Sequence, residues 1–299
     1  MDKLNQITNN FMKRGIAKGK SELLTISELK ELERLILNTK DKYLKKGSFT
    51  QNIIGIDKNI DRFIEKIITN TEVQSTLQKL LGDNYILRLC SVRYNTPYDK
   101  GLMMHQDSLG EIGLMILLNN QPDASTVFFP GSQLIPSNKK FVEMVSWNSL
   151  KLMKIAKYFL MRAKGDVGNY YYINKRTWHG RTPGKSNYTK ISLFISFFPV
   201  SSKRKDLCTE DASYNDRKSE YNLVTEPNLR KIISRENYLS AIENFEKEIN
   251  PEYSLSMKTH SNEQILKNKT YFVFMIFKIA LLELLFIPIR LKRVFKVKW

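Results

Sequence analysis

Two of the three histidines in this 299-residue chain lie in segments that could bind a metal ion. His105 is followed two positions later by Asp107 in the segment MMHQD, and His179 lies in the segment TWHGR. In an extended segment, residues i and i+2 point to the same side, so His105 and Asp107 can present their side chains to one point while Gln106 points away. If His179 came from another strand, it would complete a set of two imidazoles and one carboxylate. That donor set is typical of non-haem Fe(II) sites, in which three coordination positions stay open for a co-substrate and dioxygen.

A cation and a hydroxyl group follow the second histidine in the strand-like segment YTKISLFISFF. Alternation along a strand puts Lys190 and Ser192 on one face, opposite a mostly apolar face. An ammonium and a hydroxyl on an inward face could hold the far carboxylate of a small diacid in a dry pocket. The alternative is that Lys190 faces water at the edge of a sheet.

The middle of the chain reads as a set of short strands. Five runs are rich in β-branched and aromatic residues and are separated by Gly, Pro, Asn and Asp: 85–94, 111–120, 125–130, 165–174 and 188–200. Because they do not alternate regularly with helices, they favour an antiparallel sandwich or barrel. The fold class expected is mainly β with flanking helices.

Helical periodicity appears on both sides of these runs. Apolar residues recur at helical spacing in 25–44, 59–69 and 71–81, the last ended by Gly82, and again in 228–250. Each of these ranges is expected to be a helix.

The chain is expected to have four parts. Residues 1–84 form a helical N-terminal part packed on the core, and 85–200 form the β core, which carries a basic, lid-like helix at 148–164. Residues 201–270 are a polar linker and helix, and 271–299 form an apolar and basic C-terminal helix.

The composition limits the partners and the compartment. The chain has 48 Lys and Arg against 30 Asp and Glu, and its net charge of +18 suits anionic partners. It contains no recognition-helix pattern, RNP-like motif or Cys/His finger spacing, which argues against nucleic acid. Two cysteines, Cys90 and Cys208, are too few for a disulfide framework, and the N-terminus lacks the apolar region of a secretory signal. A cytoplasmic location is expected.

The C-terminal segment has three alternative interpretations. Residues 271–289 contain only Lys278 and Glu283 as charges, and a basic cluster follows them. Two charges in mid-segment, together with the basic cluster after it, make a complete membrane span the least favoured reading. A helix docked on the domain or in a dimer interface is the second. An in-plane helix on anionic lipid, at the inner face of a membrane, is favoured because the charges fall within about half of the helical wheel.

Several motifs together resemble a known family. A glycine at a helix end (Gly82), HQD at 105–107, FFPGSQ at 128–133, KGDV at 164–167 and HGRTPGKSNYTKISLFISF from His179 occur in this order. They resemble the phytanoyl-CoA dioxygenase-like family of Fe(II)/2-oxoglutarate-dependent oxygenases, over roughly residues 15 to 200.

The resemblance implies a specific fold and site. The core would be a double-stranded β-helix, related to jelly rolls and cupins, with the metal and 2-oxoglutarate inside one open end. His105, Asp107 and His179 would ligate Fe(II), and Lys190 would bind the distal (C5) carboxylate of 2-oxoglutarate.

The chain departs from the family at two positions. The family usually has Arg where this chain has Lys190, which keeps the charge but loses the bidentate geometry. Arg181 is a second candidate for that role. The PGSH turn common in the family ends in Gln133 here, so no role of that histidine carries over. Asp107 is present, whereas related halogenases lack the carboxylate, so the resemblance favours hydroxylation.

The function expected from the sequence is therefore a 2-oxoglutarate-dependent dioxygenase that hydroxylates a C–H bond of a small, anionic or lipid-linked substrate. Its cofactors would be Fe(II) and 2-oxoglutarate, with ascorbate as a candidate addition. Arg93 and Tyr94, on the strand that leads to the metal motif, are candidate contacts to the substrate or co-substrate. The alternative is a catalytically silent β-helix protein that binds a ligand at a membrane surface. The sequence indicates neither the substrate nor an oligomeric state.

Overall fold

The computed structural model describes residues 3–39, 49–83, 85–97, 101–107, 111–123, 126–134, 159–182, 187–199 and 224–233, together with a few helical residues between 270 and 281. The predictions for 148–158, 201–223, 234–250 and 282–299, and for Cys208, lie outside these residues.

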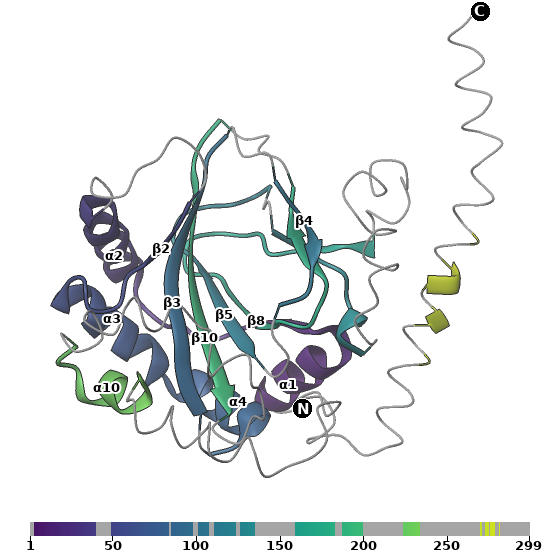
Figure 1. Ribbon diagram of the computed structural model, residues 1–299, viewed down its shortest axis with the longest axis horizontal. Coiled ribbons are helices and arrows are strands. Elements are labelled where there is room, and N and C mark those ends of the chain that lie inside the picture. The colour runs from purple at the N-terminus through teal and green to yellow at the C-terminus, as the bar shows by residue number, and fades with distance from the viewer. Residues whose placement is uncertain are drawn as a thin grey trace, which may run out of the picture.

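Two antiparallel sheets form the centre of the protein (Figure 1). The larger sheet has the strand order β1 (Ile16–Lys18), β8 (Tyr170–Asn174), β5 (Ile112–Leu117), β10 (Lys190–Pro199), β3 (Tyr85–Asn95) and β2 (Phe49–Asn52). The smaller sheet has the order β4 (Leu102–His105), β9 (His179–Arg181), β6 (Thr126–Phe128) and β7 (Met161–Arg162). All the strand pairs among the described residues are antiparallel, as the sequence predicted.

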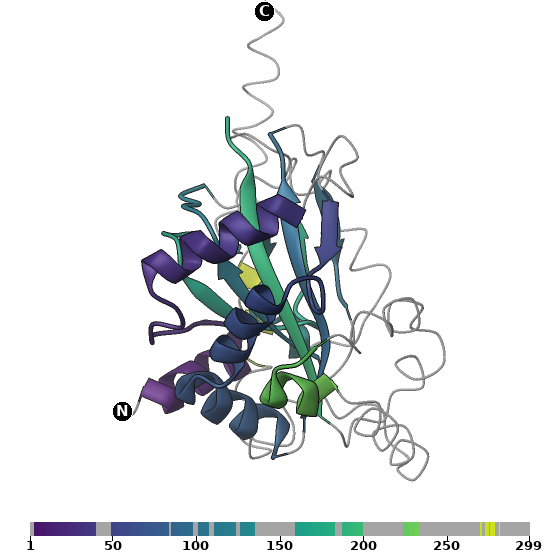
Figure 2. The ribbon, with the colours of Figure 1, turned by 90° about the vertical axis from the view of Figure 1, so that its left-hand side faces the viewer.

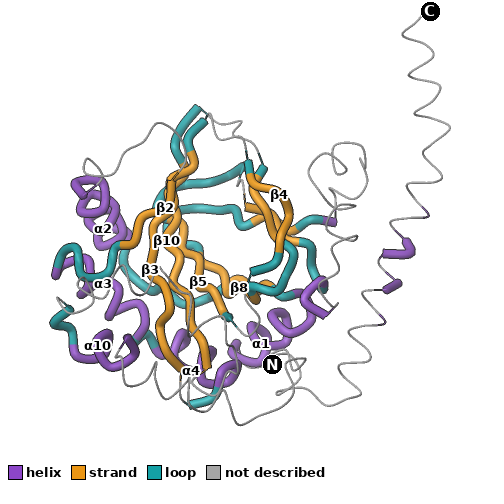
Figure 3. Tube along the Cα trace, in the orientation of Figure 1, coloured by secondary structure: helices purple, strands orange, loops and turns teal. Residues whose placement is uncertain are grey.

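Helices cover the outer face of the larger sheet, as Figure 2 shows for α2, α3, α4 and α10. Among the described residues up to 233, the α-helices are α1 (Lys3–Arg14), α2 (Ile26–Thr39), α3 (Lys58–Ile68), α4 (Thr71–Leu81) and α10 (Pro227–Ile233). Figure 3 shows α2, α3 and α10 on the side of the larger sheet that faces away from β4. None of the helices within the described part of the chain is long and apolar enough to cross a membrane.

The helix ends follow their sequence signals. Thr25 and Glu28 form a capping box at the start of α2, in which each backbone N–H donates to the other residue's side chain. Gly82 ends α4 with a φ of 86°, a conformation that disfavours residues with a Cβ.

The larger sheet separates two apolar clusters. Ile191, Leu193, Ile195 and Phe197 of β10 pack on the helix side, with Leu29, Ile64, Leu77 and other helix residues. Phe194 of β10 points the other way, into a cluster between the sheets that includes Met115, Leu117, Phe128 and Tyr171. Alternation in β10 therefore aims its even-numbered side chains into the space between the two sheets.

The structure adds strands to two parts of the chain that were expected to be helical. The N-terminal part is not only helical, because β1 pairs with β8 and β2 pairs with β3 in the larger sheet. The expected helix at 148–164 does not reach its predicted end. Met161 and Arg162 instead pair with Phe128 and Val127 as strand β7, and ladder hydrogen bonds replace the helical ones there. Helix α1 and the short strands β1, β2 and β7 were not anticipated.

Candidate metal centre

The pairing of β4 with β9 brings two histidines together. His105, the last residue of β4, is the direct partner of His179, the first residue of β9. Their imidazole centroids lie 4.4 Å apart. On the far side of β9, Phe128 pairs with His179 and stacks against its ring with a centroid distance of 6.0 Å. Two strands therefore fix the position of His179, whereas His105 lies at the open side.

Asp107 completes the group two residues beyond β4. Its backbone N–H donates to the carbonyl of Lys175, which ties the segment after β4 to the turn after β8. One carboxylate oxygen of Asp107 lies 3.4 Å from His105 Nε2, and the other lies 3.3 Å from His179 Nε2. Ligand atoms of the three side chains lie within 4.8 Å of one another.

These distances fit a metal ion. Ligands bound at about 2.1 Å with mutual angles between 90° and 109° lie about 3.0 to 3.5 Å apart. Two imidazoles and one carboxylate on one side of an ion leave its other positions open, which is the facial arrangement of non-haem iron sites. The three residues predicted from the sequence thus converge in a geometry that can hold such an ion.

Hydrogen bonding fixes the tautomer of His179. Its Nδ1 lies 2.7 Å from the carbonyl oxygen of Thr177, which can only accept, so Nδ1 carries the hydrogen. In the neutral ring Nε2 then has a lone pair, and this lone pair faces an oxygen of Asp107. Burial lowers the pKa of His179, and the opposing effect of Asp107 does not overcome it. A metal cation bound by both His179 Nε2 and the Asp107 carboxylate would stabilise this arrangement. A proton does so poorly, because burial disfavours the charged imidazolium.

Asp107 stays ionised in this setting. Burial by itself would raise its pKa, but hydrogen bonding with His105 and the charge of Lys175 act against burial, and the pKa lies well below its ordinary value. An ionised carboxylate and a neutral imidazole are the forms that bind a divalent cation.

Lys175 is a neighbour that the sequence analysis did not identify. Its Nζ lies 3.3 Å from Asp107 Oδ2 and 5.8 Å from the centre of the Phe194 ring. A Cβ at Gly113 would lie 2.8 Å from its Cε, so the lysine needs the glycine to cross this face of the sheet. Lys175 follows Ile173 by two residues, and Ile173 points between the sheets. Strand alternation could therefore have predicted that Lys175 points the same way.

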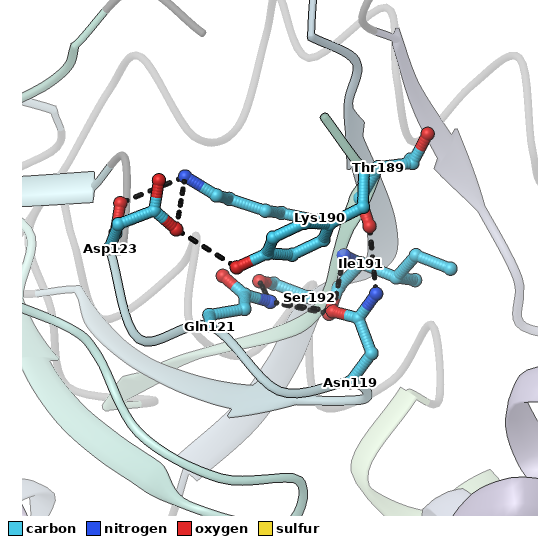
Figure 4. Close-up of polar contacts among 8 residues, drawn as sticks. Asn119, Gln121, Asp123, Thr189, Lys190, Ile191 and Ser192 are labelled. Carbon is cyan, nitrogen blue, oxygen red and sulfur yellow. Dashed lines mark hydrogen bonds and ion pairs between the residues drawn. The ribbon is translucent and has the colours of Figure 1, made fainter. Parts of the chain in front are cut away.

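Lys190 and Ser192 point inward together, as the alternation predicted. Both residues are buried, with exposed fractions of 3% and 0%, which contradicts the alternative that Lys190 faces water. Lys190 Nζ donates to the carbonyl oxygen of Asp123 at 2.8 Å and lies 3.2 Å from its Oδ1 (Figure 4). Ser192 Oγ accepts a hydrogen bond from the side-chain amide of Gln121.

A polar turn after β5 holds the start of β10. The Asn119 side chain donates to the carbonyl of Thr189 and accepts from the backbone N–H of Ile191, and Gln121 donates to the carbonyl of Ile191 (Figure 4). The cluster NNQPD at 119–123 is a turn signal in the sequence, but its pairing with residues 188–192 depends on the register of β5 and β10.

The remaining predicted contacts divide between the two faces of the larger sheet. Arg93 is the partner of Ser192 in the ladder, and its guanidinium carbon lies 5.0 Å from the centre of the Phe194 ring, near the site. Tyr94 points to the opposite face and is buried in the helix-side core, so the structure does not bring it to the site. Arg181 follows His179 by two residues in β9 and is partly buried.

Two glutamines have structural contacts. Gln106 donates to the carbonyl of Arg176 and is not in the ligand group. Gln133, where the family resemblance would place a histidine, is buried and donates to the carbonyl of Met12 near the end of α1.

The fold is similar to that of several solved structures, two of which hold 2-oxoglutarate. HygX from Streptomyces hygroscopicus, solved with nickel and 2-oxoglutarate bound, is 13% identical, covers 68% of this chain and 93% of its own, and has a TM-score of 0.53. Apo EctD from S. alaskensis is 13% identical, covers 70% of this chain and 81% of its own, and has a TM-score of 0.54. EctD with 2-oxoglutarate and 5-hydroxyectoine has a TM-score of 0.51 at 13% identity, over 67% of this chain and 77% of its own.

Sequence comparison adds no relative. The chain matches no known family model and no curated protein. At these identities the structural similarity establishes the fold alone, which is a mainly β, jelly-roll-type core with flanking helices. The fold class expected from the sequence is confirmed.

Proposed function

We propose that this protein is an Fe(II)/2-oxoglutarate-dependent dioxygenase of the phytanoyl-CoA dioxygenase-like kind, which hydroxylates a C–H bond of a small substrate. The observation that carries the proposal is the convergence of His105, Asp107 and His179 within one group. The shared fold of HygX, whose structure holds nickel and 2-oxoglutarate, supports it.

The three ligands and the inward lysine have separate roles. His105, Asp107 and His179 hold the iron by one side, and Lys190 with Ser192 binds the distal carboxylate of 2-oxoglutarate. When bound, iron with 2-oxoglutarate and dioxygen supplies the oxidising power that side chains lack, and the co-substrate leaves as succinate and carbon dioxide. Ascorbate is proposed as an addition that keeps the iron reduced.

An apolar cluster between the sheets borders the inner side of the site. Met115, Leu117, Phe128 and Phe194 are buried there, close to His179 and Lys175. A dry surrounding strengthens the attraction between Lys190 and a carboxylate and protects reactive species from solvent.

We propose an anionic substrate for the open side of the metal centre. Arg93 and Lys175 both lie against the Phe194 ring, and Arg181 follows the ligand His179 on its strand. Cationic side chains of this density favour a substrate with a carboxylate or phosphate group.

The test needs no knowledge of the substrate. Purified protein supplied with Fe(II), 2-oxoglutarate and dioxygen should form succinate slowly in an uncoupled reaction, and His105→Ala should abolish it. The variant Gln106→Ala, which changes the neighbouring side chain outside the ligand group, should retain it. A folded protein that forms no succinate above the His105→Ala background would contradict the proposed reaction.

We further propose that the C-terminal segment binds anionic membrane surfaces from the cytoplasmic side. Val273, Phe274, Phe277 and Leu281 are helical residues with exposed fractions of 47% to 66%, and they fall on one side of the helix. The sequence after residue 289 adds five Lys and Arg in 290–298 and no acidic residue.

Vesicle sedimentation tests this association. The full chain should sediment with vesicles that contain phosphatidylserine and not with vesicles of phosphatidylcholine alone, and Phe274→Ser/Phe277→Ser should weaken the binding. Equal sedimentation of the double variant would contradict the assignment. Vesicle binding by a protein that binds no metal would favour the alternative of a catalytically silent, membrane-surface protein.

A further inference from the structure

The ammonium of Lys190 already has a carboxylate partner in the same chain, Asp123. Asp123 follows the turn after β5 and accepts from two donors. Lys190 Nζ lies 3.2 Å from its Oδ1 (Figure 4), and the Tyr188 hydroxyl donates to the same oxygen at 2.9 Å. A cation and a hydroxyl thus converge on one carboxylate oxygen.

This partner has a clear electrostatic reason. The Lys190 side chain is only 4% exposed, and a buried ammonium is stable only when an anion or several acceptors compensate its lost hydration. Asp123 supplies both a carboxylate and a backbone carbonyl. Its own side chain is 46% exposed, so the pair runs from the buried end of Lys190 to the protein surface.

Asp123 takes up most of what Lys190 can donate. An ammonium has three N–H donors. Two of them are directed at Asp123, one at its backbone carbonyl oxygen and one at its Oδ1. One donor is left for a ligand. Ser192 Oγ accepts from Gln121, which leaves its own hydrogen as a second donor on the same inward face.

We propose that Asp123 competes with the distal carboxylate of the co-substrate for Lys190 and thereby sets the affinity for 2-oxo diacids. The inference rests on the proposed function. Either Asp123 turns outward when the co-substrate binds, or both carboxylates share the ammonium. In both cases the negative charge of Asp123 opposes binding of the second carboxylate.

The chemistry of the co-substrate separates this effect from others. 2-Oxovalerate has the same chain length and the same metal-chelating end as 2-oxoglutarate, but a methyl group replaces the distal carboxylate. Asp123 should therefore oppose the binding of 2-oxoglutarate and have little effect on 2-oxovalerate.

Calorimetry on the full chain loaded with Ni(II), which keeps the complex unreactive, tests the inference. Asp123→Asn is nearly isosteric and keeps the backbone carbonyl and one side-chain oxygen as acceptors for Lys190, so it should bind 2-oxoglutarate about three- to tenfold more tightly than the wild type, in line with removal of one like charge. Its affinity for 2-oxovalerate should stay unchanged. Asp83→Asn, which removes an exposed carboxylate at the end of α4, is the control for net charge and should leave both affinities unchanged.

Three results would decide against the inference. Equal or weaker binding of 2-oxoglutarate by Asp123→Asn would overturn it and assign Asp123 the role of positioning Lys190, while the proposed function would stand. A parallel gain for 2-oxovalerate would overturn it as well, because the effect would then not involve the distal carboxylate. If neither protein binds 2-oxoglutarate, the proposed function itself fails. Asp123→Ala, expected to tighten 2-oxoglutarate binding too, serves if the asparagine variant does not fold.

Discussion

His179 Nε2 and Asp107 Oδ2 lie 3.3 Å apart, with the imidazole hydrogen on the other nitrogen, which donates to the Thr177 carbonyl. A lone pair and a carboxylate oxygen face each other at this distance. Because burial lowers the pKa of His179, a proton is a poor bridge between them and a divalent cation is a good one.

Removal of one ligand should remove the metal. His105→Ala is expected to lower the affinity for Fe(II) or Ni(II) by at least about 100-fold, since two remaining ligands hold an ion poorly. The His105 side chain is 35% exposed, so the thermal midpoint of the metal-free variant should change little. Calorimetric titration with Ni(II) measures the affinity. Gln106→Ala should bind like the wild type, and an unchanged affinity in His105→Ala would exclude this residue as a ligand.

The stability of the metal-free protein should fall as the pH falls below about 6.5, the pKa of histidine in an unfolded chain. The pKa of folded His179 is lowered, so the unfolded chain binds a proton there that the folded protein does not. The contribution of Asp107, whose pKa is also lowered, is lost only at more acidic pH, near and below about 3.9. The free energy of unfolding, measured with urea in the presence of a chelator, should change less between pH 7.5 and pH 5.5 for His179→Gln than for the wild type. Identical changes would show that His179 is not buried as a neutral ring.

Lys175→Met should strengthen metal binding. The ammonium lies 3.3 Å from an oxygen of Asp107 and therefore repels a divalent cation bound to that carboxylate. Methionine keeps the apolar length of the side chain beside Phe194. The expected gain is about three- to tenfold in affinity at low ionic strength, smaller in high salt. Weaker binding in this variant would mean that Lys175 chiefly orients the carboxylate.

Asp61→Asn should stabilise the protein at pH 8. Burial, with the charges of Glu226 and Asp57, raises the pKa of Asp61 to about 6, although the backbone N–H of Gly55 donates to its side chain. Above that pKa the folded protein holds a buried charge that the unfolded chain hydrates, and the asparagine variant removes this cost. A gain of about 1 to 3 kcal/mol is expected at pH 8 and should fade below pH 6. Chemical unfolding at pH 8 and below pH 6 measures this gain. A loss of stability at pH 8 would contradict a buried, charged Asp61 that destabilises the folded protein.

Local sequence signals predicted the features that depend on strand alternation, which lie in the site, and on helix capping, which lie in the surrounding fold. The spacing of His105 and Asp107, and of Lys190 and Ser192, follows from the two-residue period of extended chain. The end of α4 follows from a glycine that adopts a positive φ.

The rest depends on contacts between distant segments. Asp123 reaches Lys190 only because β5 pairs with β10, and Lys175 reaches Asp107 only because Gly113 leaves room on the neighbouring strand. Tyr94 was expected at the site, but strand alternation turns it toward the helices. Met161 and Arg162 carry a helical pattern, yet pairing with β6 makes them a strand. Local periodicity contains no information on these pairings.

One site of this protein should bind a divalent metal and 2-oxoglutarate together. Anaerobic calorimetric titration of the full chain with 2-oxoglutarate, with and without Fe(II), measures this binding. Binding should require the metal, should be lost in His179→Ala and should be at least about tenfold weaker in Lys190→Met. Binding of 2-oxoglutarate that is independent of the metal, or no binding by a folded protein that holds Fe(II), would contradict this expectation.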